Sequence, residues 1–306
     1  MVAAIKTRSA MHRREFGQLM IGATLGGILS RGYAQTLPPQ SGSRFSVMLW
    51  TLEKQAPFDR CLEIVAEAGY QGVELTGQFQ KWSSDETRRV MTKMRSLGLT
   101  FDMLSGVKAG FADPGGASEF LAQVTAQMKA AKELESPQIN LKSGNRIDNL
   151  SRDVQHAASV ENLKRAADLA AANHVQIVVE PIDPLENPNM YLTSVSEAFE
   201  MIRAVNSPQV RVLYDFYHEQ RAGGNLIEKL EQNIDFVGLV HIADVPGRHE
   251  PGTGEIDYLN IYRKLGQLKY DKFITMEFYP TQDPVATLRK ARLDAKQATS
   301  GAAATS

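Results

Sequence analysis

From residue 44 onward, short apolar runs alternate with longer segments in which apolar residues recur at helical spacing. The short runs are rich in branched side chains, as is typical of buried strands. They predict eight strands, at residues 45–50, 71–75, 99–104, 137–142, 175–180, 210–215, 236–242 and 272–278. The segments between them predict helices near residues 57–68, 84–97, 117–135, 154–173, 194–205, 224–232 and 257–268.

Eight strands alternating with helices favour a single-domain α/β fold, the (β/α)8 or TIM barrel. Gly69 and Gly98 stand where two of the predicted helices should be capped. The connections that follow the strands are longer and more polar, and in a barrel such loops build the active site. A doubly wound open sheet is the alternative. That fold normally has a glycine-rich turn after its first strand, and LWTLEKQ at residues 49–55 is not one.

Four of the predicted strands end in a residue that can bind a divalent metal: Glu180, Asp215, His241 and Glu277. Their spacings of 35, 26 and 36 residues each correspond to about one strand-plus-helix unit. In a parallel sheet all four would therefore meet at the same end. Three carboxylates brought together repel one another unless a cation lies between them. This ligand set suits one ion of Mg, Mn, Co or Fe, and suits Zn less well because thiolates are absent.

Some of these residues also have plainer interpretations. Glu180 ends a buried strand, where an Arg or Lys partner would satisfy it as well as a metal. Taken alone, a histidine in the position of His241 is more often a hydrogen-bonded core residue than a metal ligand. Glu74, at the end of the second predicted strand, either contacts substrate or forms a salt bridge on the surface or the barrel floor. Lys142, at the end of the fourth, either binds an anionic group or caps a loop.

Two further candidates follow the ligand strands. His218 lies three residues after Asp215, where a strand passes into its loop. Arg248 lies in the Pro- and Gly-rich stretch HIADVPGRHEPGTGEIDY that begins at His241. An arginine there can bind a substrate carboxylate or phosphate through two hydrogen bonds. Loops of this composition are often only solvated turns, but the position directly after a ligand strand favours a functional one.

Basic residues are concentrated at the N-terminus. Residues 1–34 contain five basic residues and one acidic residue, so the net charge of −1 becomes about −5 without them. This segment has a basic region with Arg13-Arg14, an apolar stretch at 19–29 and a small-x-small site ending at Ala34. It resembles a twin-arginine signal peptide, which predicts export to the periplasm. An ordinary basic amphipathic N-terminus is the alternative, and the apolar stretch is too short for stable membrane insertion.

The rest of the chain is expected to comprise three segments. Residues 35–43 are expected to form a linker, 44–282 the catalytic barrel, and 283–306 a C-terminal helix followed by the disordered tail GAAATS. The acidic balance argues against nucleic acid as a partner. A single cysteine excludes an intramolecular disulfide. A small-molecule substrate is expected. The sequence does not decide between a monomer and a homo-oligomer.

Four segments resemble motifs of hydroxypyruvate isomerase-like proteins: VVEPID, YDFYHEQRAGGNL, VHIADVPGRHEPGTGEIDY and MEFYP. Those proteins belong to the xylose isomerase-like superfamily of sugar isomerases and epimerases. The resemblance extends over most of residues 44–280 and is most specific in IADVPGRHEPGTGEIDY. Some hydroxypyruvate isomerases carry Gln at the position of His241, whereas His is usual in the epimerases. The substrate is therefore open between hydroxypyruvate and a ketose-like sugar.

The resemblance implies a (β/α)8 barrel that holds one divalent metal through the four strand-end residues. It also implies that Glu180 and Glu277 flank the substrate and move protons, while His218 and Arg248 hold its oxygens. Together with the ligand pattern, it suggests proton transfer through a cis-enediolate.

Two alternatives remain. One is a lyase on the same scaffold, such as a polyol or keto-inositol dehydratase, in which the enediolate expels a β-hydroxyl. The other is a non-catalytic exported sugar-binding protein. DNA-repair endonucleases on related barrels are not favoured, because they need more histidines around the site than this chain supplies and a basic face that it lacks.

Overall fold

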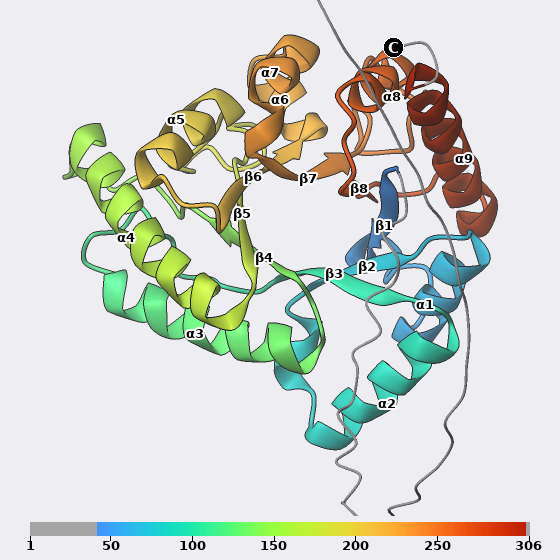
Figure 1. The fold of residues 1–306 in the computed structure, drawn as a ribbon, viewed down its shortest axis with the longest axis horizontal. Helices are drawn as coiled ribbons and strands as arrows, with labels where there is room; N and C mark the ends of the chain where they lie inside the picture. The colour runs from blue at the N-terminus through green and yellow to red at the C-terminus, as the bar shows by residue number, and fades with distance from the viewer. Residues whose placement is uncertain (1–41, 304–306) are drawn as a thin grey trace, which may run out of the picture. The chain divides into compact units, whose positions relative to one another are not determined.

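The eight predicted strands form one closed parallel barrel (Figure 1). A computed structural model describes residues 42–303; the expected signal peptide and most of the expected linker lie outside this range. The strands are β1 (Arg44–Met48), β2 (Gly72–Thr76), β3 (Thr100–Ser105), β4 (Gln138–Lys142), β5 (Gln176–Glu180), β6 (Val210–Asp215), β7 (Val237–Ile242) and β8 (Phe273–Met276). Because β8 pairs with β1, the barrel is confirmed and the open sheet is excluded.

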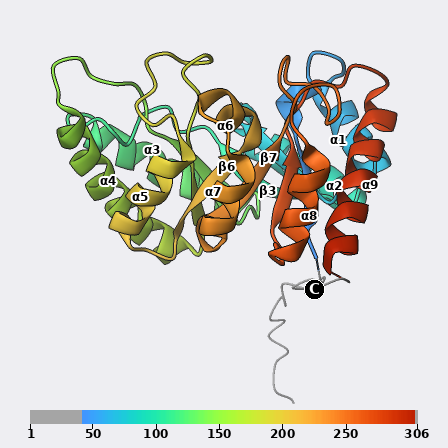
Figure 2. The same ribbon diagram turned by 90° about the horizontal axis from the view of Figure 1, so that it is seen from above.

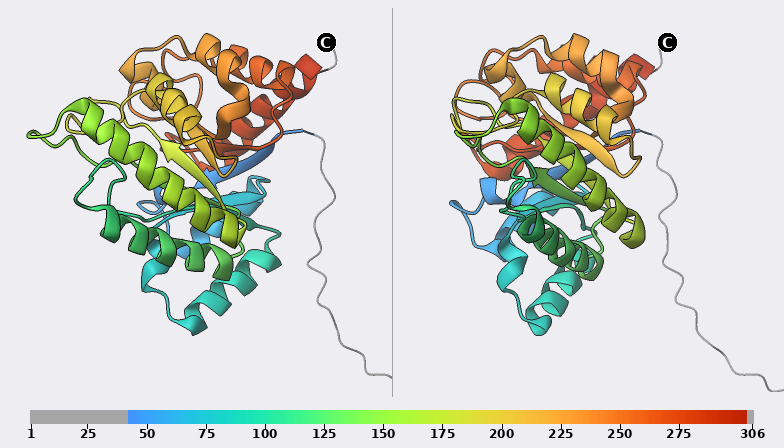
Figure 3. Two further views of the ribbon diagram at one scale, coloured as in Figure 1. Left: turned by 60° about the vertical axis from the view of Figure 1, so that its left-hand side comes forward. Right: turned by 90° about the vertical axis from the view of Figure 1, so that its left-hand side faces the viewer.

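Helices surround the barrel, and Figures 2 and 3 show them outside the strands. They are α1 (Phe58–Glu67), α2 (Ser84–Ser96), α3 (Ala117–Glu133), α4 (Arg152–Asn173), α5 (Val195–Val205), α6 (Phe216–Ala222), α7 (Leu226–Asn233), α8 (Tyr258–Gln267) and α9 (Pro284–Ala303). Short 3₁₀ turns occur at Leu49–Thr51, Gln78–Lys81 and Ile234–Phe236. None of the described helices is both long and apolar enough to cross a membrane.

Two helices differ from expectation. The pattern gave no sign of α6, which starts directly after β6 and is capped by the side chain of Asp215. Disorder was expected from Gly301, but α9 continues to Ala303. The close packing of α9 on α8 explains part of this order. A Cβ on Gly266 of α8 would lie 2.2 Å from the carbonyl oxygen of Thr299, so the two helices approach as only a glycine allows.

The barrel interior is divided into an apolar part and a polar part. Six interior side chains pack as a separate apolar cluster: Met48, Met103, Val178, Leu213, Leu239 and Phe273. The larger apolar core lies between the strands and the surrounding helices. On β1, β2, β3 and β8, by contrast, buried polar residues occur at Ser46, Glu74, Asp102 and Thr275. This polar group lies next to the candidate site.

Strand register places the predicted ligands side by side. Lys142 pairs with Glu180 across β4 and β5, and Asp215 pairs with His241 across β6 and β7. The last β7–β8 pair joins Ile242 to Met276, so that Glu277 follows immediately at the strand end. The expectation that these residues share one end of the barrel is therefore confirmed by the register.

Candidate active site at the carboxyl ends of the strands

The four predicted ligands converge at one point. One donor atom from each of Glu180, Asp215, His241 and Glu277 lies within 4.8 Å of the donor atoms of the other three. All four side chains are buried. Burying three carboxylates together is expensive unless positive charge compensates them. The surrounding residues supply part of that charge.

Arg248 compensates two of the three carboxylates. Its Nη2 donates to Glu277 Oε2 at 2.6 Å and to Asp215 Oδ2 at 2.9 Å. Its Nη1 donates to Glu186 Oε2 at 3.1 Å. The φ angle of Arg248 is +57°, which non-glycine residues rarely adopt, and the backbone is held there by bonds to Asp244 and Tyr279. The sequence-based placement of Arg248 at the site is consistent with this geometry.

Glu180 is compensated from β4. Its Oε2 accepts a hydrogen bond of 2.6 Å from Asn140 and lies 3.5 Å from Lys142 Nζ. Burial alone would raise the pKa of Glu180, but Lys142, together with His241 and His218, lowers the pKa below its usual value. Burial likewise opposes ionisation of Glu277, and Arg248 and His241 together hold its pKa well below the usual range. Both glutamates are therefore carboxylates at neutral pH.

The ring of His241 lies between two carboxylates. Nδ1 is 2.6 Å from Glu277 Oε2, and Nε2 is 3.0 Å from Glu74 Oε2. Burial would lower the pKa of His241, but Glu74 and Glu277 together raise it well above its ordinary value. Glu74 is fully buried against His241 and does not line the cavity, so its position gives the predicted contact with substrate no support. Its sequence position gave its strand but not its depth in the barrel.

His218 belongs to a second group, with Asp183 and Glu186, that the sequence pattern did not predict. Asp183 Oδ2 lies 2.7 Å from His218 Nδ1, and Arg221 lies 3.2 Å from the same oxygen. Burial would lower the pKa of His218, but Asp215 and Asp183 raise it. Asp183 and Glu186 both follow β5 in the segment PIDPLENP. Two acidic residues directly after a ligand strand are the sequence feature that could have identified this second group.

A cavity of about 220 Å³ opens over these groups. Its wall contains Glu180, Glu277, His218 and Arg248, together with Met48, Trp50, Thr76, Ser105, Asn140, Lys142, Ile182 and Glu186. Trp50 also donates to Glu277 Oε1 at 3.1 Å. Asp215 and His241 are absent from the wall. The two glutamates therefore face the cavity, while the other two predicted ligands lie behind them.

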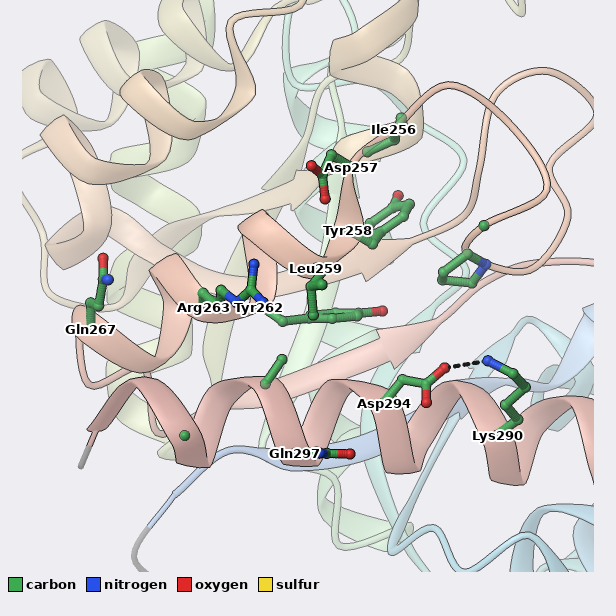
Figure 4. Close-up of a pocket in the computed structure, with 14 residues that line it drawn as sticks. Ile256, Asp257, Tyr258, Leu259, Tyr262, Arg263, Gln267, Lys290, Asp294 and Gln297 are labelled. Carbon is green, nitrogen blue, oxygen red and sulfur yellow. Dashed lines mark hydrogen bonds and ion pairs between the residues drawn. The ribbon is translucent and has the colours of Figure 1, made fainter. Parts of the chain in front are cut away.

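A larger groove of about 810 Å³ lies between α8 and α9 (Figure 4). Its lining includes Tyr258, Leu259, Tyr262 and Gln297, and its ion pair joins Lys290 to Asp294 at 2.6 Å. None of the strand-end carboxylates reaches it. The smaller cavity, where buried titratable groups converge, is thus the candidate active site.

The donor set fits a divalent metal ion. Three carboxylates and one imidazole within 4.8 Å offer hard oxygen ligands and one nitrogen ligand. The set has no sulfur, so its chemistry does not favour a structural zinc site. The plainer alternative, a buried basic partner, is also partly realised, since Lys142 lies near Glu180 and Arg248 bonds Asp215 and Glu277.

A closed (β/α)8 barrel with an acid and imidazole cluster at its strand ends defines the class of this protein as a barrel enzyme. The chain belongs to the xylose isomerase-like TIM barrel family, whose model matches residues 62–296. It is 31% identical to hydroxypyruvate isomerase of Escherichia coli (strain K12), over 80% of this chain and 97% of that protein. It is 26% identical to 2-oxo-tetronate isomerase of Haemophilus influenzae, over 80% and 96%.

A solved structure is also similar over its full barrel. The crystal structure of AP endonuclease, family 2, from Brucella melitensis matches with a TM-score of 0.74 at 27% identity, covering 80% of this chain and 96% of that one. The resemblance to hydroxypyruvate isomerase-like proteins is confirmed. Both named relatives are isomerases, and the chain is accordingly an enzyme of the isomerase class.

Proposed function

We propose that the protein is a metal-dependent isomerase or epimerase of a small α-hydroxycarbonyl compound, acting by proton transfer through a cis-enediolate. The observation that carries this proposal is the orientation of the two glutamates. Glu180 and Glu277 both line the cavity as carboxylates, whereas Asp215 and His241 lie behind them. Two ionised carboxylates facing one small cavity suit a reaction that takes a proton from carbon and returns it.

We assign separate roles in proton transfer, substrate binding and metal binding to the residues of the site. One glutamate accepts the proton from the carbon beside the carbonyl group, and the same or the other glutamate returns it. Return to the neighbouring carbon gives isomerisation, and return to the opposite face gives epimerisation. His218, held by Asp183, and Arg248 lie on the wall where they bind substrate oxygens. Glu180, Asp215, His241 and Glu277 would hold the ion, which supplies charge stabilisation for the developing enediolate.

Lys142 supports an acid as the substrate. Its side chain is 42% exposed, and its ion pair with Glu180 is 3.5 Å long. The guanidinium of Arg248, by contrast, already bonds three carboxylates at 2.6 to 3.1 Å. Lys142 is therefore the wall cation with capacity for a new anionic partner. A 2-oxo acid such as hydroxypyruvate carries the carboxylate that it would bind.

Proton exchange tests the proposed reaction. The protein is loaded with Mn²⁺, diluted into D2O with hydroxypyruvate, a four-carbon 2-oxo acid or a neutral ketose, and followed by NMR after metal removal. We expect deuterium at the carbon beside the carbonyl group. Glu277→Gln should lower the exchange rate by about 10² or more. Glu250→Gln, in an exposed loop pair with Thr281, is the matched control and should leave the rate unchanged.

Each competing function has its own outcome. Loss of water from the substrate would indicate the lyase alternative, a dehydratase on the same scaffold. Tight ligand binding without exchange or turnover would indicate a non-catalytic binding protein and would contradict the proposal.

The acid preference is tested separately. Lys142→Met should raise KM for the acid by about tenfold more than KM for a neutral ketose, the cost of one lost ionic contact of about 1.4 kcal/mol. Any effect that acts through Glu180 should lower kcat for both substrates alike. Lys129→Met on α3 is the control. A variant that loses both substrates equally would contradict the assignment of Lys142.

Residues 1–34 remain a predicted twin-arginine signal, and we propose that they direct the folded protein to the periplasm. Replacing Arg13 and Arg14 with lysine should retain the protein in the cytoplasm, as measured by cell fractionation. Periplasmic accumulation of that double variant would contradict the route.

A further inference from the structure

Four buried polar side chains form a continuous line through the barrel interior and end at His241. They are Asp102, Ser46, Thr275 and Glu74, which we call the interior chain; each is at most 1% exposed. Successive oxygens lie 2.7 Å apart from Asp102 to Ser46, 2.7 Å from Ser46 to Thr275, and 2.6 Å from Thr275 to Glu74. Glu74 Oε2 then lies 3.0 Å from His241 Nε2. These are hydrogen-bond distances at every step.

Counting hydrogens along the interior chain gives a protonation state. Its three oxygen-to-oxygen contacts need three hydrogens, and the hydroxyls of Ser46 and Thr275 supply one each. If both carboxyls were ionised, one contact would join two oxygens with no hydrogen between them. The third hydrogen must therefore come from Asp102 or Glu74.

The surroundings assign that hydrogen to Asp102. Glu74 has a partner at each oxygen, the Thr275 hydroxyl and the His241 ring. Asp102 Oδ1 has no hydrogen-bond partner among the described residues, although it is buried. An unpartnered oxygen is costly on a buried anion and much less so on a neutral acid. Burial and the nearby Glu74 also raise the pKa of Asp102 well above its usual range.

The backbone is shaped to admit this acid. The β2–β3 register advances from Val73 opposite Phe101 to Glu74 opposite Met103, so Asp102 is the extra residue of a bulge. Because Gly72 has no side chain, it leaves space that the Asp102 side chain fills. A Cβ at position 72 would lie 2.7 Å from Asp102 Oδ1 and 2.7 Å from the Cβ of Ser46. The bulge and the glycine together indicate that the backbone specifically accommodates the buried Asp102 carboxyl.

We propose that the interior chain is a positioning device for His241. A neutral Asp102 donates to Ser46, Ser46 to Thr275, and Thr275 to Glu74, whose other oxygen accepts the hydrogen on Nε2 of His241. Nδ1 is then the nitrogen that faces Glu277 and the other candidate ligands. Glu74 and Asp102 are thus positioning residues that act through His241. This inference rests on the proposed metal site.

Metal affinity is the first readout. Partners of a ligating histidine usually change metal affinity by about 10- to 100-fold when they are replaced. Glu74→Gln should therefore weaken Mn²⁺ binding by that amount in calorimetry. Asp102→Asn should change it by less than about threefold, because the amide donates to Ser46 as the neutral acid does. Equal losses in both variants, or no loss in Glu74→Gln, would overturn the proposal.

The second readout uses the metal-free protein and does not depend on activity. At pH 7 its infrared spectrum should contain the carbonyl band of a buried protonated carboxyl. The band should disappear in Asp102→Asn and persist in Glu74→Gln. If Asp102→Asn keeps the band, the hydrogen lies elsewhere and the proposal is overturned. A wild-type protein that binds no divalent metal would contradict the proposed function, while the infrared result would still decide the state of Asp102.

Discussion

At the scale of single residues, Arg248 decides how the carboxylates of the site coexist without a bound cation. It bonds Asp215, Glu277 and Glu186 and is itself buried. Removing one partner from a buried ionic group typically costs about 3–5 kcal/mol, because it leaves charge uncompensated. A divalent ion would provide the missing charge in another way.

We therefore expect Arg248→Gln to lower the unfolding free energy of the metal-free protein by about 3 kcal/mol. Saturating Mn²⁺ should recover a large part of the loss. Urea titrations with and without metal measure both values. Arg60→Gln, which breaks an exposed ion pair, should have little effect in either state. An equal loss with and without metal would show that Arg248 acts by packing rather than by charge.

At the scale of elements, the loop after β7 depends on one carboxylate. Asp244 Oδ1 accepts from the backbone N–H groups of Val245 and Ile256, and Oδ2 accepts from those of Gly252 and Gly254. The bonds join the two ends of the loop that carries Arg248. A side chain outside the cavity thus sets the geometry of one on its wall.

Asp244→Ala should consequently lower kcat/KM by about 10²-fold, the typical effect of displacing a site residue by about 1 Å. Steady-state assays measure this. The matched control is Glu255→Ala in the same loop, whose exposed side chain bonds only Gln220 among the described residues and should matter little. Unchanged activity in Asp244→Ala would mean that the loop keeps its shape without these four bonds.

Ion pairs between α1 and α2 give the surface of the barrel a dependence on pH. Arg89 bonds Asp59 at 2.6 Å, and Lys93 bonds Glu63 at 2.5 Å. Arg89 lowers the pKa of Asp59, and Lys93 lowers that of Glu63. A folded-state pKa below the unfolded value stabilises the protein above the unfolded pKa, and this stabilisation is lost as the pH falls through the folded value.

Arg89→Met should therefore reduce the urea midpoint slightly at pH 7 and leave it unchanged at a pH below the folded pKa of Asp59. The effect should shrink in high salt, because the groups are exposed. Arg263→Met on α8, away from this pair, is the control. A larger effect in acid than at neutral pH would contradict the sign of the argument.

At the scale of the whole molecule, metal binding should stabilise the entire barrel, because the four candidate ligands come from strands or strand ends spread along the second half of the chain. A ligand at 100 times its Kd adds about 2.7 kcal/mol to the unfolding free energy. For a domain of this size that corresponds to roughly 5–10 °C in Tm. Calorimetry of the EDTA-treated and Mn²⁺-loaded protein measures the difference. Glu277→Gln should reduce it, and an unchanged Tm in the wild type would argue against a metal at this site.

The sequence alone determined the order of the strands and their carboxyl-end residues. Apolar runs report burial on both faces, and a polar residue that ends such a run is conspicuous, which is why Glu180, Asp215, His241 and Glu277 were identified together. Helix α6 was missed because its seven residues are too few to show a period. Asp183 and Glu186 were missed because loop acids are common and only their position beside His218 distinguishes them.

Depth and contact were decided only by the tertiary structure. Glu74 and Glu277 each stand at or near a strand end in the sequence, yet one is enclosed beneath His241 and the other lines the cavity. Strand stagger and the bulge at Asp102 set these depths, and both are properties of the paired strands rather than of any one segment. The interior chain exists for the same reason. Its four members come from four strands and become neighbours only when the barrel closes.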